Sequence, residues 1–256
     1  MQLFHGDCLE VMKTLPDQSV DLILTDPPYG TTQCKWDSII PFEPMWNELK
    51  RIIKDNSCIA LFGSEPFSSA LRMSNIKNFK YDWYWQKDKC TNHLNCKKQP
   101  MRNTEIISIF YKKQCLYNPQ LTNKNAKDIR PPQTYRPHTE VYGEMSKVSS
   151  RGIPIDKTYP KQTLKFNVCW YKGKIFHPTQ KPVALLEYLI KTYTNENDIV
   201  LDFTMGSGST GVAAKNLNRE FIGIELDQEY YKLSKNRIEA KDLLIWKHLK
   251  SFILIY

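Results

Sequence analysis

Short apolar runs alternate with longer amphipathic segments along the chain. Between the runs, apolar positions spaced three or four residues apart predict helices at 8–15, 41–54, 65–73, 183–193 and 227–240, and one that follows a glycine loop and ends near 217. Strands that alternate with helices in this way predict an α/β protein with a doubly wound sheet. Seven of the runs predict the β-strands, at 2–5, 20–25, 58–63, 81–86, 106–111, 198–203 and 221–226.

The second predicted strand ends abruptly in Asp26-Pro27-Pro28-Tyr29. Because a proline has a fixed φ and no N–H, the chain must leave the sheet at Asp26, with that carboxylate at the carboxyl end of the strand. Ligands of open α/β sheets bind at this edge. Rigidly held acceptors beside an aromatic ring suit a site for a flat polar group, and an ordinary strand-to-loop turn is the alternative.

A glycine-rich loop follows the sixth predicted strand. Gly206 to Gly211 have the spacing G-x-G-x-x-G between an apolar strand and a helix, and the next strand ends at Glu225. Such glycines let the backbone approach a ligand and turn into the helix, and a carboxylate in the position of Glu225 accepts hydrogen bonds from ribose hydroxyls. The pattern predicts an adenosine-containing cofactor and leaves NAD, FAD and S-adenosylmethionine open, with a simple glycine turn as the alternative.

The position of this loop in the chain narrows the choice. A dinucleotide dehydrogenase usually opens its domain with the glycine loop, whereas here only 45 residues follow Gly211. The N-terminal half must therefore supply most of the strands, and the half of the sheet that binds the cofactor comes last.

Composition adds a strongly localised positive charge. The 256 residues are 41% hydrophobic, enough for a real core, and carry a net charge of +9. Residues 112–174 hold 13 Lys and Arg against 4 Asp and Glu, together with six of the 15 prolines and several interleaved aromatic residues. This favours a nucleic-acid surface over a solvated insertion. The candidate nucleic-acid contacts are Lys112, Lys113, Lys124, Arg130, Arg136 and Arg151.

The cysteines and the hydropathy bound the environment. The seven cysteines are odd in number and lack the two-residue spacing of zinc or redox motifs, so we predict no metal site, reduced thiols and a cytoplasmic protein. No apolar segment reaches membrane-spanning length, and the N-terminus does not have the pattern of a signal peptide. The apolar tail at 243–256 leaves a homodimer contact or a packing strand open.

The motifs in their order resemble one enzyme family. The Asp26-Pro27-Pro28-Tyr29 loop, the basic insertion, the run from His177 to Pro182 and the glycine loop are similar to the beta group of the amino-methylating DNA methyltransferases, which act on adenine N6 or cytosine N4. The resemblance covers about residues 1–111 and 175–241. It implies a seven-stranded, mostly parallel sheet in circularly permuted order, with one antiparallel strand in a terminal hairpin. It also implies a catalytic half at 1–111, a target-recognition insertion at 112–174 and a cofactor half at 175–256.

The resemblance also implies a cofactor, a partner and roles for residues. The cofactor would be S-adenosylmethionine and the partner double-stranded DNA. Asp26, Pro27, Pro28 and Tyr29 would be catalytic, with the aspartate carboxylate and the Pro27 carbonyl holding the amine of a flipped base and Tyr29 stacking on its ring. The implied cofactor residues are Asp7 and Cys8 for adenine, Glu225 for ribose, and around the methionine moiety His177, Thr179, Lys181, Pro182, Asp202, Phe203, Gly206, Ser207, Gly208, Thr210 and Gly211.

The choice of base follows from the first motif position. In the family, Asp usually goes with adenine N6 and Ser with cytosine N4, so Asp26 favours adenine. Both amines present the same two hydrogens, which keeps an N4-cytosine enzyme as the alternative. A catalytically silent DNA-binding relative is a second alternative, against which the complete motifs argue, and a nicotinamide-dependent oxidoreductase would have no use for the basic insertion. The sequence assigns no recognition site and no restriction endonuclease partner.

Overall fold

The computed structural model describes residues 1–31, 37–129, 154–168 and 180–240. The chain divides into two compact units, a larger unit of residues 1–118 and 162–256 and a smaller unit of residues 119–161. The described part of the smaller unit contains the antiparallel pair β6 (Thr122–Asn123) and β7 (Lys157–Thr158) and the short helix η2 (Ala126–Asp128).

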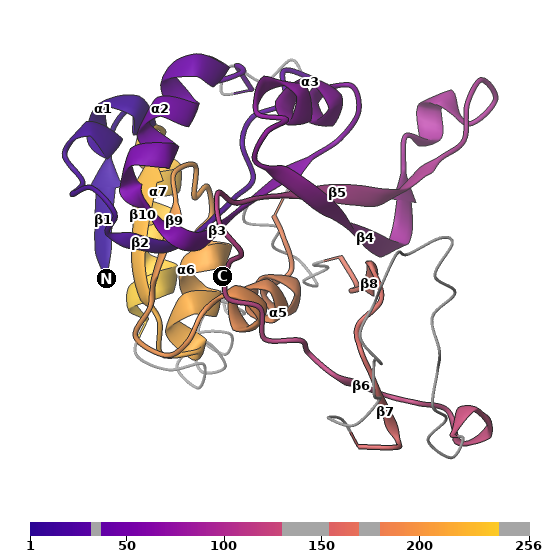
Figure 1. Ribbon diagram of the computed structural model, residues 1–256. Helices are drawn as coiled ribbons and strands as arrows, with labels where there is room; N and C mark the ends of the chain where they lie inside the picture. The colour runs from indigo at the N-terminus through magenta and orange to yellow at the C-terminus, as the bar shows by residue number, and fades with distance from the viewer. Residues whose placement is uncertain (32–36, 130–153, 169–179, 241–256) are drawn as a thin grey trace, which may run out of the picture. The chain divides into compact units, whose positions relative to one another are not determined.

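The larger unit is built on an eight-stranded sheet in the order β1-β10-β9-β2-β3-β5-β4-β8 (Figure 1). Neighbouring strands run parallel from β1 to β3, and β5 runs antiparallel to both β3 and β4. The predicted permuted order with one antiparallel strand is therefore confirmed, whereas the sheet has eight strands where seven were predicted, and β8 lies beyond the hairpin at the edge. The strands are β1 (Gln2–His5), β2 (Val20–Thr25), β3 (Ile53–Gly63), β4 (Phe79–Thr91), β5 (Arg102–Phe110), β8 (Thr163–Lys165), β9 (Ile199–Asp202) and β10 (Glu220–Glu225).

Helices cover both faces of this sheet. The helices α1 (Cys8–Lys13), α2 (Phe42–Ile52) and α3 (Phe67–Ser74) share one buried cluster with Ile23, whereas α5 (Val183–Tyr193), α6 (Ser209–Asn216) and α7 (Gln228–Glu239) share the other with Leu22 and Leu24. Consecutive residues of β2 thus point into opposite cores, which explains why this strand is apolar throughout. The sheet is doubly wound, as predicted.

Several elements differ from the sequence prediction, and three of the differences have a clear physical cause. The helix predicted to reach residue 54 ends at Ile52, because Ile53 is already extended and pairs with Val20 in the sheet. The hairpin strands are longer than the predicted runs at 81–86 and 106–111, since their polar ends pair with each other. The strand β8 was missed altogether: three residues are too few for a periodic signal, and they form a strand only because they pair with Tyr84 to Gln86 of β4.

No helix among the described residues is long and apolar enough to cross a bilayer. The apolar tail at 243–256 lies outside the described residues.

Candidate active site

Four parallel strands end at one edge of the sheet and place four carboxylates around a cleft of about 1070 Å³. Asp7 follows β1, Glu225 ends β10, Asp202 ends β9 and Asp26 follows β2. The strands β1 and β2 come from the N-terminal part of the chain, and β9 and β10 come from the C-terminal part. The sheet order β1-β10-β9-β2 brings them side by side, so both parts of the chain contribute to the cleft. A cleft of this volume can hold a nucleoside-sized cofactor and a second flat group.

The Asp26 carboxylate is bound from two sides. The Tyr29 hydroxyl donates to Oδ1, and the Lys181 ammonium forms an ion pair with Oδ2. The Thr204 hydroxyl donates to the Asp26 carbonyl at 3.1 Å, which ties the loop after β2 to the end of β9. The side chain of Asp26 keeps 25% of its area exposed, so a ligand in the cleft can still reach it.

Alternating charges continue away from Asp26. The Lys181 Nζ lies 3.3 Å from Glu105 Oε2, and Glu105 Oε1 lies 2.9 Å from Lys87 Nζ. The side chains of both lysines are buried, and β5 supplies the glutamate between them. Buried charges are stable only when they are paired, and in this row of four side chains each charge lies next to one of opposite sign.

The pKa values follow from these neighbours. Burial raises the pKa of Asp26 and the negative charge of Glu105 raises it further, while the Lys181 ammonium opposes both. Burial acts on Glu105 too, but Lys181 and Lys87 hold the pKa of that carboxyl below its usual value. Burial works against the charged form of Lys181, but the two carboxylates outweigh it and raise the pKa of this ammonium. Burial and the nearby carboxylates raise the pKa of Tyr29, which therefore keeps its proton.

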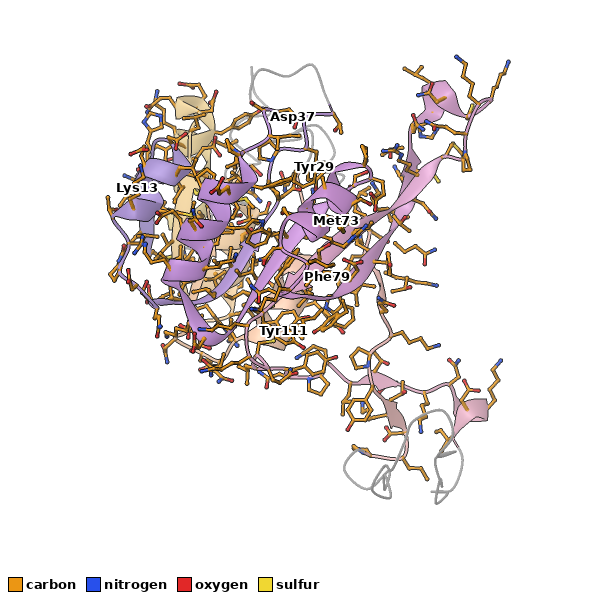
Figure 2. All side chains as sticks on the ribbon, turned by 45° about the horizontal axis from the view of Figure 1, so that its top comes forward. Lys13, Tyr29, Asp37, Met73, Phe79 and Tyr111 are labelled. Atoms are coloured by element: carbon orange, nitrogen blue, oxygen red, sulfur yellow. The ribbon has the colours of Figure 1, made fainter. Side chains whose placement is uncertain are left out.

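A further carboxylate, that of Asp37, shapes the loop that carries Tyr29. Asp37 accepts hydrogen bonds from the backbone N–H groups of Tyr29 at 2.8 Å, Gly30 at 2.9 Å and Thr31 at 2.9 Å. Gly30 has a φ of +67°, where an L side chain would be strained. In Figure 2, Tyr29 and Asp37 lie at one end of the sheet and Tyr111 at the other. The centroid of the Tyr29 ring lies 5.1 Å from that of the Phe67 ring.

The glycines of the G-x-G-x-x-G loop have two different uses. Gly206 lines the cleft, and its N–H donates to Glu225 Oε2 at 2.8 Å. A Cβ on Gly208 would lie 2.8 Å from the Ser234 Cβ, and one on Gly211 only 2.4 Å from the Ile238 Cδ1. These two glycines therefore let α6 approach α7 closely, and they do not line the cleft.

The other predicted cofactor carboxylates also have protein partners. Asp202 accepts from the Thr210 hydroxyl at 2.6 Å and from the Thr204 N–H at 3.2 Å, and burial raises its pKa to about 7. Asp7 caps α1, because its carboxylate accepts hydrogen bonds from the N–H groups of Leu9 and Glu10. Beside it, burial raises the pKa of the Cys8 thiol to about 12, so that thiol is neutral.

Most of the predicted site residues meet at this cleft. All four predicted catalytic residues line it. Nine predicted cofactor residues line it as well: Asp7, Cys8, Lys181, Asp202, Phe203, Gly206, Ser207, Thr210 and Glu225. Pro182 lies outside the lining and precedes α5. His177 and Thr179 lie outside the described residues.

Two of the predicted DNA contacts, Lys112 and Lys113, lie away from the cleft. Lys112 and Lys113 follow β5 and pair with Asp55 at 3.0 and 2.7 Å, at the edge of the sheet where β3 begins, opposite the cleft. Lys124 belongs to the smaller unit, where its Nζ donates to the Ile155 carbonyl at 3.1 Å. The predicted arginines at 130, 136 and 151 lie outside the described residues.

Sequence reasoning missed Glu105, Lys87 and Asp37. Glu105 had one signal, a lone acid directly before the apolar half of a strand, and Asp37 had none beyond being an acid in a polar loop. Both become recognisable only when the contacts to Lys181 and to the Tyr29 backbone are known. Among the described residues, no group of three or more His, Cys, Asp or Glu side chains is placed to hold a metal ion.

The fold and the cleft together define an α/β enzyme with a nucleoside-type cofactor site next to an Asp-Pro-Pro-Tyr loop. The chain belongs to a DNA methylase family, since the family model N6_N4_Mtase, described as DNA methylase, matches residues 20–236. It is an S-adenosylmethionine-dependent DNA methyltransferase, which confirms the resemblance found in the sequence.

Individual relatives match over nearly the whole chain. The type II methyltransferase M2.LlaDCHI of Lactococcus lactis subsp. cremoris is 30% identical, over 92% of this chain and 88% of its own. The DNA adenine methyltransferase YhdJ of Escherichia coli is 30% identical, over 93% of this chain and 82% of its own. The crystal structure of the M1.HpyAVI–SAM complex has a TM-score of 0.62 and 28% identity, and the match covers 93% of this chain and 98% of that one.

Proposed function

We propose that the protein is a site-specific DNA methyltransferase that transfers a methyl group from S-adenosylmethionine to N6 of an adenine flipped out of duplex DNA. The observation that carries this is the meeting of the Asp26 loop with the glycine loop and Glu225 in one cleft. Asp at the first motif position favours adenine, and one relative with 30% identity is named a DNA adenine methyltransferase. An N4-cytosine target is the second candidate, because that amine offers the same two hydrogens.

The residues present fit S-adenosylmethionine. Seven carboxylates line the cleft against four Lys and Arg side chains, an excess that suits a cofactor with a positive sulfonium. Each oxygen of Glu225 accepts one backbone N–H, from Gly206 or Asp227, and keeps capacity for a ribose hydroxyl. We propose that Glu225 holds the ribose, Asp7 and the Cys8 backbone the adenine, and the Gly206–Ser207 segment the methionine part.

Catalysis by this chain is mostly positioning. The bound cofactor supplies a methyl group already activated on a sulfonium. The exocyclic amine of adenine is a weak nucleophile because its lone pair is delocalised into the ring. Asp26 and the Pro27 carbonyl would each accept one amine hydrogen, which frees the lone pair for in-line attack. As the bond from nitrogen to the methyl group forms, the bond from that methyl to sulfur breaks. Asp26 would stabilise the positive charge that develops on nitrogen until the methylated amine loses a proton to solvent.

The contacts that Asp26 already makes are compatible with this role. A carboxylate has about four acceptor sites, so Asp26 can keep Lys181 and still accept an amine hydrogen. The Tyr29 hydroxyl occupies one further site, and its ring lies between Asp26 and Phe67. We propose that the Tyr29 ring stacks on the flipped base once the base has entered.

The test is methyl transfer to duplex DNA with isotopically labelled S-adenosylmethionine, followed by mass spectrometry of the nucleosides. We expect N6-methyladenine from the wild type. Asp26→Asn should lower kcat by at least about 10²-fold, because it removes the charge that stabilises the reacting nitrogen, while cofactor binding persists. Asp17→Asn, on the surface away from the cleft, is the matched control.

Three results would contradict parts of this proposal. Methyl on cytosine N4 would select the second candidate. Full turnover by Asp26→Asn would remove the role of that carboxylate. Transfer to RNA or protein but to no DNA would overturn the function itself. Sequencing of methylated genomic DNA after expression in a methylation-free host then gives the recognition site.

We further propose that the smaller unit belongs to the target-recognition region predicted at 112–174. A homodimer and a cytoplasmic location remain predictions.

A further inference from the structure

The hairpin of β4 and β5 continues beyond the rest of the sheet. On one side β3 pairs with β5 only as far as Ile106, and on the other β8 pairs with β4 only at Tyr84 to Gln86. Farther out, the two strands pair with each other alone, with Thr91 opposite Arg102. Figure 1 shows this end of the hairpin and its loop projecting from the sheet. Residues 93–102 are all exposed, so the extension adds nothing to the core.

The tip of the hairpin is nevertheless an ordered turn. Its helix η1 (His93–Asn95) follows Asn92, which has a φ of +69°. The Asn95 amide donates to Asn92 Oδ1 at 2.9 Å, and the Lys98 N–H donates to the Asn95 carbonyl at 2.8 Å. A turn held by its own hydrogen bonds presents its side chains in a fixed arrangement before any partner binds.

That turn presents an apolar side chain to solvent. Leu94 is 101% exposed, the most exposed of the large hydrophobic residues described. Lys97 and Lys98 follow it within four residues, and residues 87–104 hold five Lys and Arg against one Asp. An apolar tip flanked by lysines is the combination that inserts between bases while neighbouring charges contact phosphates. The charge favours DNA over a second copy of this basic chain.

The part of the same hairpin between the sheet and the tip forms part of the catalytic cleft. Lys89, Thr91, Arg102 and Thr104 line the cleft that contains Asp26. A duplex that delivers a base into this cleft must therefore pass the hairpin.

We propose that this hairpin is a DNA-contacting arm, in which Leu94 enters the base stack beside the flipped adenine and Lys97 and Lys98 contact the adjoining phosphates. The inference rests on the proposed function and adds an element outside the basic insertion at 112–174. Extruding a base breaks its pairing and stacking, and an apolar side chain that fills the gap offsets part of this cost.

The experiment compares Leu94→Ala with the wild type on two duplexes that share the mapped target site. In one the target adenine is paired with thymine, and in the other it faces an abasic position, which makes extrusion easier. We expect Leu94→Ala to lower kcat/KM on the paired duplex by roughly 10- to 100-fold, and by less than about threefold on the abasic duplex. Met73→Ala, at a 70% exposed methionine on α3, is the matched control and should change neither rate.

Two further measurements separate this role from a structural one. With 2-aminopurine at the target position, the fluorescence increase on binding should be smaller for Leu94→Ala than for the wild type. Replacing both Lys97 and Lys98 with Gln should lower the slope of log affinity against log salt by up to about 1.8.

The outcomes distinguish a failure of the proposed Leu94 wedge from a failure of the proposed function. An unchanged rate for Leu94→Ala, or an equal loss on the paired and abasic duplexes, would overturn the wedge while the proposed function stands. A wild type that methylates no DNA would overturn the proposed function, and this inference with it. Binding of S-adenosylhomocysteine, followed by thermal shift, should be the same for all variants and shows that they are folded.

Discussion

Lys181 is the residue on which the charge state of the site depends. It is buried, and it joins the carboxylate of the catalytic loop to Glu105 on β5. Asp26 must be ionised to accept amine hydrogens, and burial works against that charge. The ammonium of Lys181 opposes this effect of burial on the pKa of Asp26, and Asp26 together with Glu105 keeps the ammonium charged. The methionine-side role predicted for Lys181 therefore gives way, in our proposal, to a positioning role on Asp26.

Opposite changes of charge around Asp26 should move its pKa in opposite directions. Lys181→Met removes the positive neighbour, so the pKa of Asp26 rises and more of the enzyme is protonated at a given pH. Glu105→Gln removes a negative neighbour, so the pKa of Asp26 falls. Activity requires the ionised form and is lost as pH drops through this pKa. We therefore expect the acid limb of kcat against pH to shift by about 1–3 units upward for Lys181→Met and to move downward for Glu105→Gln.

The pH profile separates this explanation from a loss of structure. A variant that merely unfolds or misplaces the loop would lose kcat at every pH, with the acid limb in place. Lys181→Arg, which keeps the charge, should restore most of the wild-type profile. Shifts of both variants in the same direction would contradict the proposed coupling of these charges.

The sequence predicts a site residue when its neighbours in the chain determine its position, and misses one whose position depends on distant contacts. Asp26 could be placed because two prolines force the chain out of the sheet at that residue. Glu105 could not, because its partner Lys181 is 76 positions away in the chain and the two meet only through the order of the strands. The same holds for Asp37, which supports a loop that precedes it.

At the scale of elements, strand pairing determines boundaries that the spacing of apolar residues in the sequence does not predict. Ile53 continues the apolar stripe of α2, yet it begins β3 because Val20 offers it a strand partner. The three residues of β8 form a strand only because they pair with β4. The role of the glycine loop likewise depends on a neighbouring element, the helix α7. The spacing of that loop suggested three glycines facing a cofactor, whereas the structure assigns Gly208 and Gly211 to the contact with α7.

The contact between α6 and α7 can be tested by one methyl group. Gly211→Ala places a Cβ 2.4 Å from the Ile238 Cδ1 and 2.7 Å from the Phe221 Cε1, so we expect a loss of about 1–3 kcal/mol in the free energy of unfolding. Ile238→Val removes the Cδ1 atom. Denaturant unfolding of the two single variants and the double variant should show a double variant more stable than the sum of the single effects predicts. Strict additivity would mean that Gly211 serves another purpose.

At the scale of the whole molecule, the excess positive charge and the catalytic cleft lie in different parts of the chain. The excess positive charge lies within 112–174, which spans the whole smaller unit, while the cleft and its carboxylates belong to the larger one. The sequence predicted this division because charge is visible without a fold. It could not predict which basic residues face DNA, since that depends on partners such as Asp55, which pairs with both Lys112 and Lys113.

Salt dependence distinguishes these basic residues. Each phosphate contact adds about 0.9 to the slope of log affinity against log salt. We expect that replacing Lys124, Arg130, Arg136 and Arg151 with Gln lowers this slope by up to about 3.6, because these residues belong to the region we propose for target recognition. Replacing Lys112 and Lys113 should leave the slope unchanged, because they pair with Asp55 at the edge of the sheet opposite the cleft. Titration of a labelled duplex at several salt concentrations measures both, and a lower slope for the Lys112 and Lys113 variants alone would mean that DNA extends to that edge.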